Sequence, residues 1–161
     1  MSLSIGDRIP EATLYLPSDS GPQPTSTGEI FSGRKVVLVG MPGAFTPTCH
    51  RNHLPGFIEN RDAILEKGVD EIVVLSTNDA WVMGAWAESS GAKDRIRFVS
   101  DGNGEFVRKA GLDYDSSARG MGTRSRRFAM IVEDGVVTSL AVEDAPGQAV
   151  ASNAAGILEK L

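Results

Sequence analysis

The stretch Lys35–Gly40, with the sequence KVVLVG, is the part of the chain that decides the fold. An unbroken run of β-branched and aliphatic residues is typical of a strand buried on both faces, in a sheet covered by helices. Thr48 to Lys67 follows with apolar residues at helical spacing, and Ile72 to Ser76 repeats the strand pattern. The three segments predict a βαβ unit in which 35–40 is a central strand.

Shorter elements are expected on both sides of this unit. Ala12 to Leu16 and a second extended run near Glu29–Phe31, separated by prolines and glycines, indicate an N-terminal β-hairpin. Pro55-Gly56 should kink or interrupt the first helix. The later part of the chain predicts a helix after Asn78 and Asp79, a strand at Arg97–Ser100, a short helix from Gly104 to Ala110, a hairpin of Arg127–Val132 with Val136–Val142, and a last helix from Ser152 to Leu161.

This order of elements predicts an α/β chain with a mixed central sheet and helices on both of its faces, in three layers. The length of 161 residues suits one domain, and we expect a single domain over residues 1–161. No apolar run approaches the roughly 18 residues of a membrane span, and the first residues lack a basic segment followed by a hydrophobic one. We expect no membrane partner and a cytoplasmic location.

The charge of the chain argues against binding to nucleic acid. The formal net charge is -5 and the isoelectric point is about 5.0, whereas phosphate backbones are bound by an excess of Lys and Arg. Arg119, Arg124, Arg126 and Arg127 do lie close together in the sequence. We interpret them as solvated charges plus one functional arginine.

Cys49 is the only cysteine, so the chain can form neither an internal disulfide nor a zinc site of several thiolates. It follows a loop that starts at Met41 and should end on a helix N-terminus, where unpaired N–H groups and the helix dipole favour a thiolate. Pro42 and Pro47 restrict this loop, so the Thr46 hydroxyl and the Cys49 sulfur can be held at a fixed separation. Attack of a thiolate on a peroxide requires donors for both oxygens, and Thr46, the Cys49 amide and an arginine could supply them.

The loop Pro42–Cys49 closely resembles the signature of the peroxiredoxin family, in its atypical type II branch. The resemblance continues through His53–Phe57, Ser76–Asp79, Arg124–Met130 and Glu133–Gly135, and covers nearly the whole chain. It implies a thioredoxin-like fold, a homodimer with the active-site loop near its interface, and a thiol peroxidase that needs no cofactor.

The resemblance also assigns roles to single residues. Cys49 corresponds to the cysteine that attacks the peroxide, Thr46 to the hydroxyl that binds it, and Pro42 to the residue that shields the sulfur. Arg127 matches the active-site arginine, and His53 matches a position beside the active site.

Two features depart from the family pattern. The second cysteine of many relatives is absent, so a sulfenic acid on Cys49 would be reduced by an external thiol such as glutathione, glutaredoxin or thioredoxin. His50 stands where relatives usually carry a small polar residue.

Each of these residues has a simpler interpretation as well. Cys49 could be a small core residue, Thr46 a helix cap, and Arg127, like Arg124 and Arg126, a solvated residue at a strand edge. Strand alternation puts Arg126 and Arg127 on opposite faces but cannot say which points inward. Trp81 and Trp86 are interpreted as core or interface aromatics.

His53 leaves further alternatives open, because it lies four residues after Cys49 on one helical face. A Cys49–His53 pair would suit a hydrolase or acyl transferase, although no residue that would orient the histidine is evident. Cys49, His50 and His53 could in principle bind a metal, but His50 projects away and no carboxylate completes the set, so we expect none. A domain that senses oxidation without catalytic turnover is the third hypothesis.

Overall fold

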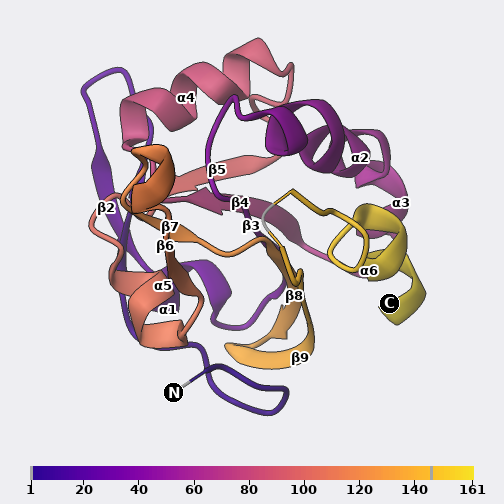
Figure 1. Ribbon diagram of the computed structural model, residues 1–161. Helices are drawn as coiled ribbons and strands as arrows, with labels where there is room; N and C mark the ends of the chain where they lie inside the picture. Colours follow the sequence, from indigo (N-terminus) through magenta and orange to yellow (C-terminus); the bar gives the residue numbers. More distant parts are fainter. Residues whose placement is uncertain (1, 146) are drawn as a thin grey trace.

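The computed structural model describes residues 2–145 and 147–161 (Figure 1). Within these residues the main sheet has the strand order β2-β1-β5-β4-β3-β8-β9, and β6 pairs with β7 in a separate small sheet. The strands are β1 Thr13–Leu16, β2 Gln23–Ser26, β3 Lys35–Gly40, β4 Glu71–Ser76, β5 Arg97–Ser100, β6 Asp113–Asp115, β7 Thr123–Ser125, β8 Phe128–Glu133 and β9 Val136–Val142. The α-helices are α1 Thr27–Phe31, α2 Leu54–Glu59, α3 Arg61–Glu66, α4 Ala80–Ser89, α5 Glu105–Ala110 and α6 Ala154–Lys160. A π-helix covers Cys49–His53 and a 3-10 helix covers Ser117–Arg119.

The strand β3 has the central position that its sequence predicts. It pairs in parallel with β4 and antiparallel with β8, and its residues from Val36 to Gly40 are buried. The mixed sheet is therefore confirmed, and so is the turn at Asp134-Gly135, where both residues have positive φ values of 48° and 77°.

Helices cover both faces of the sheet (Figure 1), with one apolar cluster on each face. The helices α2, α3, α4 and α6 pack on one face, around Phe57, Ile64 and Trp86, while α1 and α5 pack on the other, around Phe31 and Phe106. The expected three layers are present, and the loop that carries Cys49 belongs to the layer of α2 to α4.

The N-terminal hairpin is present, but its second strand differs from the prediction. Glu29–Phe31 lies in the helix α1, and β1 pairs instead with Gln23–Ser26. The Ser26 side chain caps α1 by accepting a hydrogen bond from the Glu29 N–H at 3.1 Å, and Ile30 and Phe31 are buried against the sheet. Pro24 is tolerated in β2 because this is an edge strand, where a residue without an N–H need not break a hydrogen bond to a neighbouring strand.

The helical segment after Cys49 is irregular at two places. The π-helix ends at His53 and α2 begins at Leu54, so the change in helix type lies directly before the Pro55-Gly56 pair that predicts a kink. A second interruption, which the sequence does not predict, falls at Asn60, between α2 and α3. The strands β6 and β7 have no predicted counterpart, because each has three residues and is too short to show alternation.

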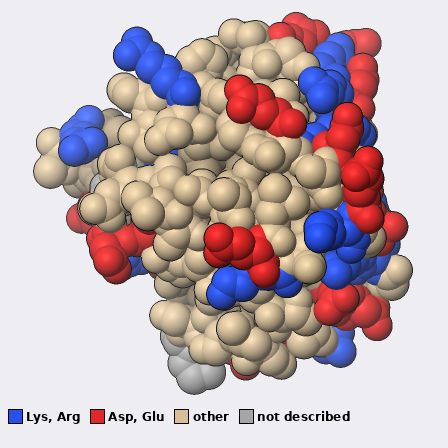
Figure 2. Space-filling view, turned by 90° about the vertical axis from the view of Figure 1, so that its right-hand side faces the viewer, with Lys and Arg blue, Asp and Glu red and all other residues tan. Residues whose placement is uncertain are grey.

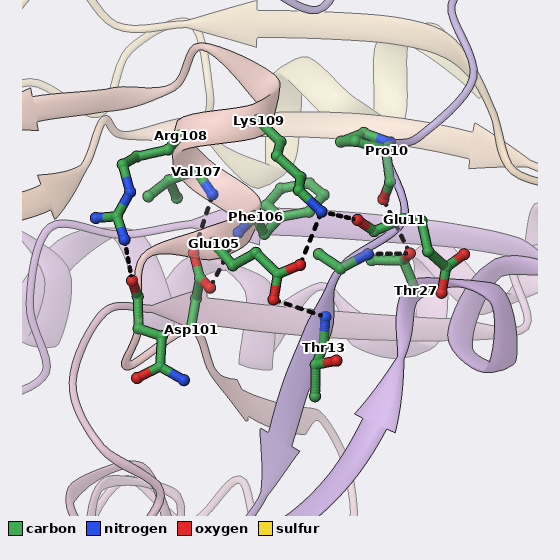
Figure 3. A network of polar contacts seen from close by, with 12 residues as sticks. Pro10, Glu11, Thr13, Thr27, Asp101, Glu105, Phe106, Val107, Arg108 and Lys109 are labelled. Atoms are coloured by element: carbon green, nitrogen blue, oxygen red, sulfur yellow. Dashed lines mark hydrogen bonds and ion pairs between the residues drawn. The ribbon is translucent and has the colours of Figure 1, made fainter.

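Hydrogen bonds connect α5 to the loop after β5 and to the N-terminal segment before β1 (Figure 3). The buried Asp101 carboxylate accepts from the N–H groups of Phe106 and Val107 at 3.1 and 3.0 Å. Lys109 Nζ donates to the Glu11 carbonyl at 2.7 Å and to Glu105 at 2.8 Å. Burial raises the pKa of Asp101 to about 6, against these two hydrogen bonds.

The surface charges are mixed in sign. On the face shown in Figure 2, acidic and basic side chains lie next to one another along one side, and a few charged side chains also interrupt the largely uncharged middle. No helix among the described residues is long and apolar enough to cross a membrane.

Candidate active site

The end of β3 is packed tightly against β8. Gly40 pairs with Phe128, and a Cβ atom on Gly40 would lie only 2.0 Å from the Phe128 ring. Only glycine fits here, because the aromatic ring fills the space of a side chain. This pairing brings Arg127, which precedes Phe128, alongside the loop that follows Gly40.

Hydrogen bonds hold the loop between β3 and the π-helix from two sides. The Asn78 Oδ1 atom accepts from the Ala44 N–H and from the Ser76 hydroxyl, both at 2.8 Å. Arg124 Nη1 donates to the Pro42 carbonyl at 3.4 Å. Phe45 has a φ of 63°, a strained conformation for a residue with a side chain, and its ring is 46% exposed.

The predicted residues Pro42, Thr46 and Cys49 lie together in this segment. Pro42 is buried, Thr46 is half-buried, and the Thr46 hydroxyl donates to the Gly43 carbonyl at 2.7 Å. Cys49 is fully buried at the first residue of the π-helix, and the N–H of the next residue, His50, bonds to the Thr46 carbonyl at 2.8 Å. The only thiol thus lies in the first turn of a helical segment, where the helix dipole favours negative charge.

Arg127 and His53 meet beside this helix. Arg127 is only 2% exposed, whereas Arg126 is exposed, which decides which of the two points inward. Arg127 Nη1 lies 3.1 Å from His53 Nδ1, and His53 Nε2 lies 2.8 Å from the Ser152 carbonyl oxygen. Since a guanidinium can only donate, Nδ1 accepts from Arg127 and the ring proton lies on Nε2, which donates to Ser152.

The surroundings of His53 favour this neutral form. Burial is the main cause that lowers the pKa of His53, to about 4, and the charge of Arg127 lowers it further. The hydrogen bond with Ser152 and the charge of Glu143 oppose this shift without reversing it. With both ring nitrogens engaged elsewhere, His53 is not placed as the base of a Cys49–His53 pair.

A second histidine lies next to the thiol. His50 Nδ1 accepts a hydrogen bond from Trp86 Nε1 at 2.9 Å, and the rings of His50 and Phe45 are 5.4 Å apart. Trp86 is a core residue, as expected, while Trp81 is 68% exposed. Among the described residues no group of three or more His, Cys, Asp or Glu side chains is arranged to hold a metal ion.

Three residues near the site have a place that their sequence does not predict. Arg124, expected to be solvated, is half-buried and binds the loop carbonyl of Pro42. Glu143 and Ser152, which connect to His53, carry no sequence signal, because they lie far from it along the chain. Only the antiparallel pairing of β8 and β9 and the fold of the C-terminal segment bring them there.

Known proteins resemble the chain over nearly its whole length. A family model described as Redoxin matches residues 4–158. Peroxiredoxin-2B of Arabidopsis thaliana is 41% identical over 160 residues, which cover 99% of this chain and 98% of the relative.

Solved structures agree with this match. Reduced Prx3 of Vibrio vulnificus in complex with H2O2 is 44% identical with a TM-score of 0.92, and 98% of each chain is covered. The 1-Cys peroxiredoxin of Plasmodium falciparum is 31% identical with a TM-score of 0.88, over 96% of this chain and 97% of that one. These likenesses confirm the expected thioredoxin-like fold. The chain therefore belongs to the peroxiredoxin family and is a thiol-dependent peroxidase.

Proposed function

We propose that Cys49 carries the peroxidase reaction and forms a sulfenic acid. The thiolate attacks one oxygen of a hydroperoxide, the O–O bond breaks, and the other oxygen leaves with a proton as water or an alcohol. The observation that carries the proposal is that the helix that begins with the only thiol also carries the histidine bound to a buried cation. Cys49 starts the π-helix, and His53 in the same helix holds the Arg127 guanidinium.

Thr46 and Arg127 take complementary parts in this proposal. Because the Thr46 hydroxyl donates its proton to the Gly43 carbonyl, its oxygen remains an acceptor for the O–H of the peroxide. Arg127 has only donors and stabilises the charge that grows on the leaving oxygen. The buried ring of Pro42 limits the access of water to the sulfur. The H2O2 complex of the Vibrio vulnificus relative supports hydrogen peroxide as a substrate.

An external thiol completes the cycle, since Cys49 has no partner cysteine in its chain. One thiol attacks the sulfenic acid to give a mixed disulfide and water, and a second thiol releases Cys49 and leaves as a disulfide. The reductant we propose is glutathione, glutaredoxin or thioredoxin. Because Cys49 is fully buried, the first turn of the π-helix has to open before so large a partner can reach the sulfur.

We also propose that two copies of the chain form a homodimer near the active-site loop. The exposed ring of Phe45 in that loop is the feature that supports this arrangement. Light scattering on a size-exclusion column gives the mass in solution. A Phe45→Glu variant should shift a dimer to a monomer, and a monomeric parent protein would contradict the proposal.

The test of the reaction is stopped-flow mixing of the reduced protein with one equivalent of hydrogen peroxide. Trp fluorescence follows the reaction, and mass spectrometry of the trapped protein identifies a sulfenic acid on Cys49. Thr46→Val removes the hydroxyl at nearly constant shape, and Arg127→Ala removes the buried cation. Arg126→Ala is the matched control, because it removes a neighbouring but exposed arginine.

We expect rapid oxidation that slows roughly 100-fold in Thr46→Val and Arg127→Ala but not in Arg126→Ala, as removal of a stabilising donor does elsewhere. A wild-type rate no better than that of free cysteine would overturn the proposal. Repeated turnover with glutathione or thioredoxin separates the enzyme from a sensor, which would be oxidised once and stop.

A further inference from the structure

Four buried residues form a closed ring of polar contacts behind the site. Arg127, His53, Ser152 and Glu143 are exposed by 2%, 1%, 0% and 6%. The Arg127 side chain reaches His53, His53 reaches Ser152, Ser152 reaches Glu143, and the Glu143 N–H donates to the Arg127 carbonyl at 2.9 Å. Burying such a network costs free energy unless every polar group has a partner. Each hydrogen bond therefore restricts the orientation of the next side chain in the ring.

Glu143 fixes the orientation of Ser152. One carboxylate oxygen, Oε2, accepts from both the Ser152 N–H and the Ser152 hydroxyl at 2.6 Å. Burial alone would raise the pKa of Glu143, but the hydrogen bonds from Ser152 and from the N–H groups of Ala151 and Val150 outweigh it and lower that pKa. The carboxylate is therefore ionised and holds the segment just before α6.

Ser152 in turn fixes the histidine. Its carbonyl oxygen accepts the Nε2 proton of His53 at 2.8 Å, and its hydroxyl oxygen lies 3.3 Å from the same nitrogen. A proton held on Nε2 leaves Nδ1 as an acceptor, and this is the form of the ring that can receive the Arg127 guanidinium. In these protonation states, every hydrogen-bond donor in the ring faces an acceptor.

We propose that Glu143 and Ser152 are positioning residues for the peroxidase reaction, acting through His53 on Arg127. They fix the tautomer and the orientation of the His53 imidazole. The imidazole in turn fixes the Nη1 group of Arg127, whose guanidinium faces the peroxide. This inference rests on the role of Arg127 given above. It assigns to the C-terminal segment a part in catalysis, although that segment carries no residue that touches the substrate.

The experiment measures the second-order rate constant of Cys49 oxidation by hydrogen peroxide in Glu143→Gln and Ser152→Ala. Each variant is made in the wild-type protein and again in the Arg127→Ala background. Asn153→Ala is the matched control: its side chain caps α6 through the Gly156 N–H at 2.8 Å, so the change loosens the same segment without touching the ring. Circular dichroism and thermal unfolding show that each variant is folded.

We expect Glu143→Gln and Ser152→Ala to slow oxidation about tenfold in the wild-type background and by less than about twofold when Arg127 is already alanine. Asn153→Ala should lower the melting temperature and leave the rate unchanged. Wild-type rates in both ring variants would overturn the inference, and so would a loss that persists undiminished without Arg127. A slow parent protein would instead refute the proposed function itself.

Discussion

Gly40→Ala is expected to destabilise the protein strongly through a single steric conflict. The new Cβ atom would lie 2.0, 2.4 and 2.5 Å from three atoms of the Phe128 ring. Real contacts of this kind are well over 3 Å, so either the ring or the β3–β8 pairing must move. Phe128 is fully buried and cannot swing into solvent. Overpacking of this kind costs roughly 1–3 kcal/mol, and the rigidity of the site places this case at about 3 kcal/mol.

Urea denaturation measures the loss, and two further variants test its cause. Gly56→Ala is the control, because a Cβ there meets nothing within 4 Å and the position is helical, so it should leave stability unchanged or raise it by about 0.5–1 kcal/mol. Phe128→Val removes the ring atoms that clash, so Gly40→Ala should cost less than about 1 kcal/mol in that background. Equal stability of Gly40→Ala and the wild type would refute the reasoning, as would an undiminished loss in Phe128→Val.

The remaining predictions concern the site. His53 is protonated near pH 6.5 in the unfolded chain but only near pH 4 in the folded one, so the unfolded state binds more protons between these values. Stability therefore rises with pH through this window and is lost as the pH falls from about 6.5 to about 4, by up to about 3 kcal/mol from this residue. Urea titrations at pH 7 and 4 should show a smaller fall in His53→Gln; an equal fall would contradict the assignment. Trp86→Phe should abolish the fluorescence change on oxidation while Trp81→Phe keeps it, because only Trp86 bonds to the neighbour of Cys49; a signal that follows Trp81 would be the contrary result. Asn78→Ala removes the acceptor that holds the loop and should slow oxidation about tenfold in stopped-flow mixing, whereas an unchanged rate would show that the loop keeps its shape without it.

Local patterns sufficed for the elements whose sequence signal is strong. The β3 strand, the short strand β5 and the hairpin at Asp134-Gly135 follow from runs of β-branched residues and from turn chemistry. The prediction failed at Glu29–Phe31, because a short apolar segment fits a strand and a helix equally well, and there the Ser26 cap decides. The break at Asn60, between α2 and α3, is not predicted, because neither glycine nor proline marks that position.

The candidate site divides in the same way. Pro42, Thr46 and Cys49 were identified from the sequence because they are contiguous, and a strand followed by a constrained loop and a helix places them together. For Arg127 the alternation of the strand left two faces open, and only the burial of its side chain decided between them.

The sequence by itself thus determined the central βαβ unit, the loop and the position of the only thiol at a helix start, since all of these depend on neighbours along the chain. Only the tertiary structure shows that Arg124 binds the loop and that His53 contacts Arg127 rather than Cys49. It also shows that Ser152 connects Glu143 to His53. The contacts of Arg124 with Pro42, of Arg127 with His53 and of Ser152 with His53 join residues 82, 74 and 99 positions apart. Their geometry depends on the pairing of β3 with β8 and of β8 with β9, and on the path of the chain before α6. Local periodicity in the sequence predicts neither of these.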